Sequence, residues 1–240
     1  RRKITIPEVV ACADTTLTNK NETRLPKKQS EGDMPKIAVT TGGCDQLSCM
    51  LPKVGIDPTE FGIAGSKAAV HFYSAGGASG PSGMTDAKAF WSNLTELKKY
   101  DLAVFSCECY EAPTTKDATS FKAVTDYLAA GGRIFTTDFQ YTWYKFSPDS
   151  ALSSIGTIPG GAPGGANPAI LDTKFPKGKA LADWMKYVDP LVPYTEVNCD
   201  YVFDNVYSVD PKKSQTWASS GGGSSGATHP RFVTINTPVG

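Results

Sequence analysis

Cys107 is the residue whose type and position best suit nucleophilic chemistry. It lies just beyond an apolar run, residues 102–106, that is typical of a buried strand, so a strand-turn-helix elbow would present its sulfur. The next expected helix begins only at Asp117, too far along the chain for its positive end to stabilise a thiolate. A base is also needed, and the two histidines are His71, which we expect to be packed inside a strand, and His229, which we expect in a turn. No complete catalytic set is therefore predicted.

Two carboxylates accompany Cys107 as catalytic candidates: Glu108 beside it and Asp138 at the end of a later strand. Asp138 belongs to an aromatic cluster that could stack a sugar ring or floor a pocket, made of Phe139, Tyr141, Trp143, Tyr144 and Phe146. A core or a covered sheet edge explains the same cluster, and we favour that interpretation.

The carboxyl ends of parallel strands form the edge at which open α/β sheets bind ligands. If the apolar runs of this chain build such a sheet, the candidate crevice residues are Thr41, Gly42, Gly43, Ser74, Gly76, Cys109, Glu111, Gln140 and Tyr141. The glycine pairs at 42–43 and 76–77 lack the G-x-G-x-x-G and G-x-x-x-x-G-K spacings of phosphate-binding loops. We therefore interpret them as tight strand-to-helix turns, and we predict no cofactor.

The six cysteines suit crosslinks better than a metal centre. Cys107 and Cys109 are separated by one residue, and no C-x-x-C or H-E-x-x-H pair supplies further ligands, so no metal site is predicted. In a doubly wound sheet the first and third strands are neighbours, so Cys44 could pair with Cys107 or with Cys109. Cys12 and Cys199 could pair with each other or with cysteines beyond the visible ends. The even number of cysteines and the glycine-rich loops favour an oxidising compartment, and hence a secreted or cell-surface protein.

The elements that must position these residues alternate between strand and helix. Apolar runs predict four strands, at residues 36–41, 68–73, 102–106 and 133–137. Helical spacing of apolar residues predicts three intervening helices, at residues 44–54, 86–100 and 117–130. Such alternation implies right-handed crossovers, so the predicted fold class is a three-layer α/β sandwich with a mostly parallel, doubly wound sheet.

The regular alternation ends after the fourth strand. Residues 155–168 are rich in glycine and proline and predict a long loop, and residues 219–227 predict a flexible tip. A helix at 178–188 is expected to return the chain to the core, with four residues facing inward: Leu181, Trp184, Met185 and Val188. The remaining predicted strands lie at residues 201–209, at residues 214–218 and from Phe232 onward.

The composition excludes two classes of partner. The 24 lysine and arginine residues balance the 24 aspartate and glutamate residues, so the chain lacks the basic field that a nucleic-acid partner requires. No run approaches the roughly 20 apolar residues of a membrane-spanning helix, so no transmembrane segment is predicted.

Both ends of the chain are typical of strands, so we expect a piece of a longer polypeptide. Residues 1–18 are expected to be a strand and its exit, residues 19–33 a polar linker, and residues 34–240 an α/β domain with a truncated C-terminus. An unpaired strand within residues 1–10 would leave an open edge, through which the chain could pair with another copy or another protein.

The run from Tyr100 to Phe139 (YDLAVFSCECYE, then FKAVTDYLAAGGRIFTTDF) resembles the flavodoxin-type, amidotransferase-like domains, especially the ThuA-like group. The final run Arg231–Thr234 is similar to the late core strand of that group. The segments RRKITIP, TRLPKKQSEGDMPKIAVTTG, LPKVGIDPTEFG, SCE and FVTINTPVG resemble large uncharacterised envelope proteins of myxobacteria, and this resemblance covers nearly the whole chain. In those proteins a carboxypeptidase-regulatory-like β-sandwich precedes the α/β domain. The resemblance implies that residues 1–18 are the last strand of that sandwich and its exit.

The sequence departs from the catalytic members of the amidotransferase class. Those enzymes have G-x-C-x-G at the nucleophile, whereas Cys107 has neither glycine, and Arg231 stands after His229-Pro230 where they have glutamate. The resemblance and its departures predict a non-catalytic secreted or surface protein that acts in binding or extracellular assembly, with carbohydrate as a candidate ligand. The alternative is a hydrolase of a carbohydrate or amide at the carboxyl edge of the sheet, using Cys107, Glu108 or Asp138.

Overall fold

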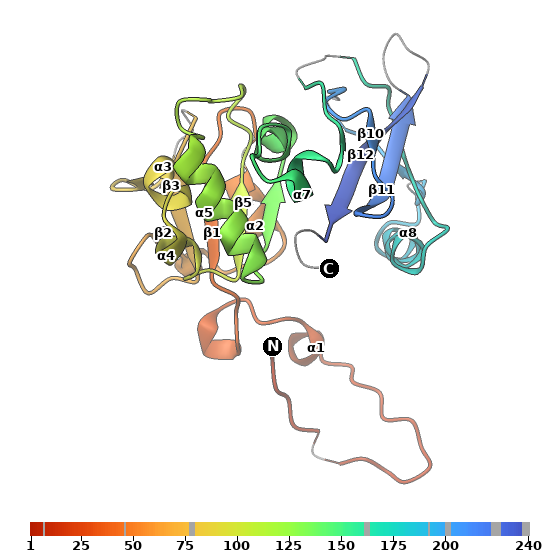
Figure 1. The fold of residues 1–240 in the computed structure, drawn as a ribbon. Coiled ribbons are helices and arrows are strands. Elements are labelled where there is room, and N and C mark those ends of the chain that lie inside the picture. Colours follow the sequence, from red (N-terminus) through yellow and green to blue (C-terminus); the bar gives the residue numbers. More distant parts are fainter. Residues whose placement is uncertain are drawn as a thin grey trace.

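The computed structural model shows a parallel sheet and a separate antiparallel sheet (Figure 1). It describes residues 1–6, 8–45, 47–76, 80–160, 164–191, 193–199, 203–221 and 227–236. None of the helices within these ranges combines the length and apolar character needed to cross a bilayer.

The parallel sheet is built by the first part of the chain. Its strands are β1 (Ile37–Thr40), β2 (Phe61–Ile63), β3 (Val70–Ser74), β4 (Thr85–Asp86), β5 (Leu102–Phe105) and β6 (Ile134–Thr136). The order is β2-β3-β1-β5-β6, β4 pairs with β3, and every pair is parallel. β1 thus lies inside the sheet, between β3 and β5, and the predicted α/β class with a mostly parallel sheet is confirmed.

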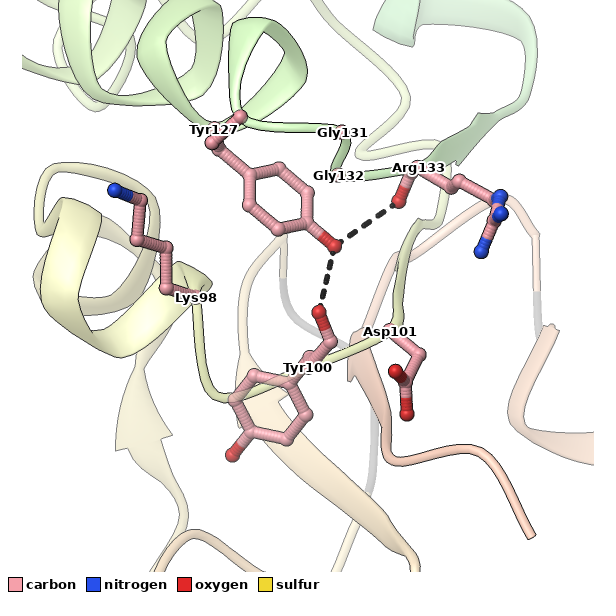
Figure 2. A pocket seen from close by; sticks show the side chains of 8 residues that line it. Lys98, Tyr100, Asp101, Tyr127, Gly131, Gly132 and Arg133 are labelled. Atoms are coloured by element: carbon pink, nitrogen blue, oxygen red, sulfur yellow. Dashed lines mark hydrogen bonds between the residues drawn. The ribbon is translucent and has the colours of Figure 1, made fainter.

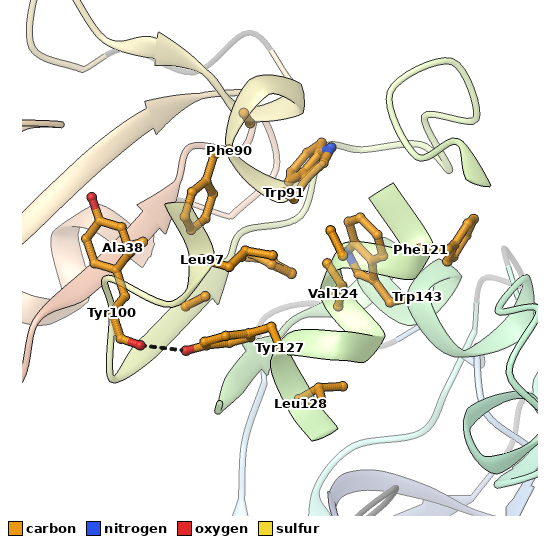
Figure 3. Close-up of a cluster of buried hydrophobic side chains, with 14 of the residues drawn as sticks. Ala38, Phe90, Trp91, Leu97, Tyr100, Phe121, Val124, Tyr127, Leu128 and Trp143 are labelled. Atoms are coloured by element: carbon orange, nitrogen blue, oxygen red, sulfur yellow. Dashed lines mark hydrogen bonds between the residues drawn. The ribbon is translucent and has the colours of Figure 1, made fainter. Parts of the chain in front are cut away.

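Apolar clusters cover both faces of this sheet. In β5, Ala103 and Phe105 join one cluster, whereas Val104 joins the other, because successive side chains of a strand point to opposite faces. The larger cluster contains residues of α3 (Ala87–Trp91), α4 (Leu94–Leu97) and α5 (Ala118–Ala129), together with Trp143 of α6 (Thr142–Lys145) and Leu152 of α7 (Ser150–Ser153) (Figure 3). The smaller cluster contains Leu51 of α2 (Met50–Lys53). Burial on both faces explains why these strands are continuous apolar runs.

Two of the predicted helices are shorter than expected. Within the described residues of 44–54, namely 44–45 and 47–54, the helical elements are α2 and the preceding 3-10 turn η2 (Leu47–Cys49). The predicted helix 86–100 is broken at Asn93, whose side chain accepts hydrogen bonds from the amides of Thr95 at 3.0 Å and Glu96 at 3.3 Å. Asparagine starts a new helix in this way because its side chain competes for backbone donors. By contrast, α5 begins as predicted, with Asp117 as its N-cap.

The C-terminal part of the chain forms an antiparallel sheet with the order β12-β11-β8-β9. Its strands are β8 (Ala169–Leu171), β9 (Glu196–Val197), β11 (Ser214–Gly221) and β12 (Thr228–Ile235). The run Arg231–Thr234, expected as a late core strand, therefore lies in β12 beside β11 and outside the parallel sheet. The connection from the parallel sheet contains η4 (Asp138–Tyr141), α6 (Thr142–Lys145), α7 (Ser150–Ser153) and β7 (Gly156–Thr157). β7 pairs antiparallel with β10 (Ser208–Val209), which lies later in the chain, between β9 and β11. Parts of the predicted loop, strand and tip, at 161–163, 201–202 and 222–226, lie outside the described residues.

Helix α8 (Pro176–Val188) packs on this second sheet in an orientation that the sequence only half predicts. Leu181 and Met185 face the cluster of the antiparallel sheet, as expected. Trp184 and Val188 were expected to face inward, but they are 59% and 55% exposed. The buried residue of α8 in this cluster is Ala182, so the face that meets the sheet carries a small side chain and not Trp184.

The N-terminal region forms no strand in residues 1–6 and 8–18. A strand needs a neighbour for its backbone groups, whereas the backbone hydrogen bonds here are the contact of Arg1 with Asp33 and a local turn in which the Ala13 amide donates to the Val10 carbonyl at 3.4 Å. Residues 19–33, expected to be a linker, contain α1 (Lys20–Thr23) and the 3-10 turn η1 (Gln29–Glu31). They are anchored to the parallel-sheet region, because the buried carboxylate of Glu60 accepts hydrogen bonds from Gln29 Nε2 at 2.7 Å and its backbone amide at 2.8 Å.

Candidate functional site

Four loops meet at the carboxyl edge of the parallel sheet, as the sequence predicted. We call them the strand-end loops: residues 41–44 after β1, 74–76 from the end of β3, 106–111 after β5 and 137–141 after β6. Thr41 Oγ1 accepts a hydrogen bond from the Ala75 amide at 3.0 Å, and Gln140 Nε2 donates to the Ser106 carbonyl at 2.7 Å. Ser74 closes β3 and donates to the carbonyl of Thr85 at 3.4 Å.

Glycines allow these loops to touch backbone to backbone. A Cβ on Gly42 would lie 2.2 Å from the carbonyl oxygen of Cys107, and one on Gly43 would lie 2.7 Å from that of Gly76. Gly76 has a φ of +54° and leaves 2.9 Å between its ideal Cβ position and the Cα of Glu108. The Cys44 amide donates to Cys107 O at 3.2 Å, so it is engaged within the protein and not directed at a phosphate. These contacts favour the interpretation of the glycines as packing and turn residues.

A disulfide joins two of the strand-end loops. Cys44 and Cys109 are bonded with a Cα–Cα distance of 5.2 Å, and both residues are exposed. This selects one of the two pairings predicted for Cys44, and it follows from the direct pairing of β1 with β5. Cys107 keeps a free thiol, and Cys12 and Cys199 are not bonded to each other.

The Cys107 thiol is enclosed and not activated. Its residue is fully buried, its sulfur lies 3.4 Å from Asp138 Oδ2, and the Cys109 amide donates to it at 3.4 Å. Burial raises the pKa of the Cys107 thiol to about 12, because a thiolate would lose its hydration there. Cys107 lies at the sheet edge, as the sequence predicted. Its environment favours the protonated thiol, whereas a nucleophilic cysteine must lose that proton.

We expect native Cys107 to resist alkylation by iodoacetamide from neutral pH up to about pH 9, where a thiol of pKa about 12 is ionised in roughly one molecule per thousand. Mass spectrometry of digested protein would follow its labelling beside that of exposed Cys12. Cys107 should label only after unfolding, whereas Cys12 should label in the native protein. Rapid native labelling of Cys107 that rises through neutral pH would contradict this expectation.

Glu108 belongs to a buried ion pair that the sequence did not reveal. Lys116 Nζ lies 2.5 Å from Glu108 Oε2, and the two side chains are 1% and 2% exposed. Gln140 Nε2 donates to the same oxygen at 3.3 Å. Burial lowers the pKa of Lys116, while Glu108 acts in the opposite direction. No local pattern marks Lys116, because it and Glu108 lie eight residues apart in the irregular connection between β5 and α5, where no helical or strand period relates them.

Asp138 carries two signs of an unusual environment. Its φ is +38°, which is rare for a residue other than glycine, and burial raises the pKa of its carboxyl group. One oxygen accepts from the Cys107 thiol and the other from the side-chain amide of Asn205. The sequence identified Asp138 as a candidate, but Asn205 lies far along the chain and carried no signal.

Glu111 and Tyr141 form the outer part of the site. The Tyr141 hydroxyl donates to Glu111 Oε1 at 2.7 Å, and Lys145 Nζ lies 3.1 Å from the same oxygen. Burial acts to raise the pKa of Glu111, but these two contacts hold it below its ordinary value. Burial also raises the pKa of Tyr141, and its hydrogen bond to Glu111 acts in the same direction.

The aromatic cluster near Asp138 is largely core, in agreement with the favoured interpretation. Trp143 is buried and its ring lies 5.4 Å from that of Trp91 and 5.4 Å from that of Phe121 (Figure 3). Tyr141 is buried as well, whereas Phe146 is exposed. A sugar-stacking role is therefore not supported for Trp143.

Both histidines are engaged inside the protein. His71 is buried in β3, with Nδ1 2.8 Å from the Tyr100 hydroxyl and Nε2 3.2 Å from the Ser66 carbonyl, as expected for a packed histidine. Burial lowers the pKa of His71. His229 was expected in a turn, but it is buried in β12 with Nδ1 2.5 Å from Asp204 Oδ1.

The segment Phe203–Asn205, here called the bridging segment, connects the two sheets. Asn205 donates to Asp138 at the edge of the parallel sheet. Asp204 accepts from Arg231 of β12 at 3.0 Å and contacts His229. No sequence motif marks this group, because Asp204 lies 25 residues from His229 and 27 residues from Arg231.

A shallow pocket lies at the opposite, amino end of β5 and β6 (Figure 2). Its volume is about 150 Å³ and it is lined by Lys98, Tyr100, Asp101, Tyr127, Ala130, Gly131, Gly132 and Arg133. The Tyr127 hydroxyl fills one side by donating to the carbonyls of Tyr100 at 3.0 Å and Arg133 at 3.4 Å. The pocket is therefore separate from the strand-end loops.

Comparison of this chain with known protein families, curated proteins and solved structures finds no match. In the part of the chain that the structure describes, histidine, cysteine and acidic side chains form no cluster of three or more suited to a metal ion. The function must therefore be argued from the site itself.

Proposed function

We propose that this protein is secreted or surface-associated and acts in binding or extracellular assembly without catalysis. The observation that carries the proposal is the state of the three catalytic candidates. Cys107 is buried as a thiol, Glu108 is paired with Lys116, and Asp138 is held by Cys107 and Asn205. Side chains that are bound to internal partners in this way stabilise the fold and are not available for catalysis.

Two further observations support the framework of the proposal. The exposed disulfide between Cys44 and Cys109 suits an oxidising compartment, where such a bond persists. The order β3-β1-β5-β6 within the parallel sheet supports a flavodoxin-type domain of the amidotransferase-like, ThuA-like kind.

The N-terminal segment supplies the proposed assembly element. Its apolar side chains are unusually accessible: Val9 is 66% and Val10 is 58% exposed. Residues 1–6 and 8–10 form neither helix nor strand, and a segment of this kind can add as a strand to the sheet edge of a second copy. We propose this pairing as the contact through which the protein self-associates.

Size-exclusion chromatography with light scattering tests the assembly. The full chain should show a molar mass that rises with concentration, and the double variant Val9→Asp/Val10→Asp should remain monomeric, because charges at both positions oppose pairing. The matched control is Val54→Asp, which places one charge at a 70% exposed valine elsewhere. A full chain that is monomeric at every concentration would contradict the proposed assembly contact.

A hydrolase acting on a carbohydrate or amide is the second candidate, favoured by Asp138 alone. Its left-handed backbone and its raised carboxyl pKa are features that gather at functional sites. The iodoacetamide experiment described above tests whether such a hydrolase could use Cys107. A Cys107 thiol that reacts in the native protein would supply the missing nucleophile.

A further inference from the structure

Lys116, Glu108 and Gln140 form a closed polar group inside the larger apolar cluster. Their residues are 4%, 2% and 0% exposed. The lysine Nζ and the glutamine Nε2 contact the same oxygen, Oε2 of Glu108, at 2.5 and 3.3 Å. A primary amine, a carboxyl group and a carboxamide are thus held together without solvent.

The surroundings of this group suit acyl transfer. The rings of Trp91 and Trp143 flank Lys116 Nζ at 5.8 and 6.0 Å from their centroids. The indole N–H of Trp143 donates to Gln140 Oε1 at 2.7 Å, which polarises the carboxamide carbon. Gln140 Nε2 is held by the Ser106 carbonyl at 2.7 Å, so the carboxamide is fixed at both of its ends.

Ion-pair stability alone is a weak reason for this arrangement. Removing two charges from water costs several kcal/mol per ion, and apolar replacements of similar volume often stabilise a protein. In an apolar enclosure the neutral forms, an amine and a carboxylic acid, become accessible by one proton transfer across the 2.5 Å contact. Burial lowers the pKa of Lys116 in the direction that this transfer requires.

We propose that Lys116 and Gln140 join in an intramolecular isopeptide bond, with Glu108 as the proton carrier. The inference is independent of the proposed assembly, because it concerns only groups inside the α/β domain.

The reaction needs no co-reactant. Glu108 takes a proton from the Lys116 ammonium group, and the neutral Nζ attacks Cδ of Gln140 while the Trp143 N–H stabilises the developing charge on Oε1. Glu108 then returns the proton to Nε2, and the Cδ–Nε2 bond breaks. The Nζ–Cδ bond replaces it and one ammonium ion leaves, carrying the remaining proton of the amine through Glu108. The carboxylate is regenerated and no oxidation state changes.

The bond would connect the start of α5 to the end of β6. Lys116 directly precedes the N-cap of α5, and Gln140 lies in η4 after β6. A covalent ring would then close around α5 and β6 next to the Cys44–Cys109 disulfide, so two crosslinks of different chemistry would brace one sheet edge.

Intact-mass spectrometry of the reduced full chain tests the proposal. We expect the folded protein, after prolonged incubation, to be lighter than its sequence by the mass of one ammonia molecule. Tryptic digestion should fail at Lys116, and fragment spectra should show the peptides of Lys116 and Gln140 joined. The variants Lys116→Arg and Glu108→Gln should keep the full mass, whereas Lys122→Arg, which changes an exposed lysine of the same region, should show the loss.

Two results overturn the proposal, and neither depends on whether a variant folds. One is a wild-type protein that keeps its full sequence mass after incubation in the native state. The other is a loss of ammonia that fragment spectra locate at an asparagine, as a cyclic imide, with Lys116 still cleaved by trypsin.

Discussion

The variant Lys116→Met is expected to lose about 3–5 kcal/mol of unfolding free energy relative to wild-type protein of full sequence mass, in which the ion pair is intact, because it leaves the carboxylate of Glu108 buried without its charge partner. Glu108 would retain the hydrogen bond from Gln140, which satisfies one lone pair but not the charge. Urea denaturation followed by tryptophan fluorescence would measure the loss, since Trp91 and Trp143 flank the substituted side chain. Intact mass of the same samples shows whether the wild-type reference carries the ion pair or the crosslink.

Two further variants show whether the loss of stability comes from the buried charge of Glu108. Lys122→Met removes an exposed i,i+4 pair with Asp126 and should cost less than about 0.5 kcal/mol. The double variant Glu108→Leu/Lys116→Met removes both buried charges and should recover most of the loss. A single Lys116→Met variant that is as stable as the Lys122→Met control would show that Glu108 is not confined as the structure indicates.

Removing the disulfide should produce the second large effect. The double variant Cys44→Ser/Cys109→Ser opens a loop of 65 residues, and we expect it to lower the free energy of unfolding by about 2–4 kcal/mol. The main reason is that the crosslink limits the unfolded ensemble, and long loops gain most from that limit. Thermal or urea unfolding with and without the substitutions gives the difference.

A reductant provides an independent form of the same experiment. Both half-cystines are exposed, so dithiothreitol should bring the wild-type unfolding midpoint close to that of the double variant. The control is Cys12→Ser, which removes an exposed free thiol and should leave the midpoint and its response to reductant unchanged. A wild-type midpoint that ignores the reductant would contradict a stabilising bond at this position.

The parallel sheet was predictable because its strands are buried on both faces. The run Leu102–Phe105 is apolar throughout, Ile37–Thr40 is apolar up to its last residue, and glycine pairs follow two of the strands. The strand order then restricts Cys44 to partners after β5, which is why the disulfide could be narrowed to two pairings. Predictions of this kind succeed because burial and topology leave a local pattern in the sequence.

The missed features depend on contacts that leave no local pattern. Lys116 acquires its role from Glu108 and Gln140, and Asp204 acquires its role from β12. The orientation of α8 was predicted wrongly for a related reason, since the small residue Ala182 and not the large Trp184 lies in the buried cluster of the antiparallel sheet. Hydrophobic spacing identifies an apolar stripe on a helix, but it does not show which face of the helix packs against the sheet.

The bridging segment also determines how the molecule would respond to mechanical load. A pull on β12 reaches Asp204 through Arg231 and His229, and the neighbouring Asn205 passes it to Asp138 at the end of β6. The two sheets are therefore connected in series by side chains as well as by the main chain. A tethered molecule would transmit tension from its C-terminal strand directly into the edge that the disulfide braces.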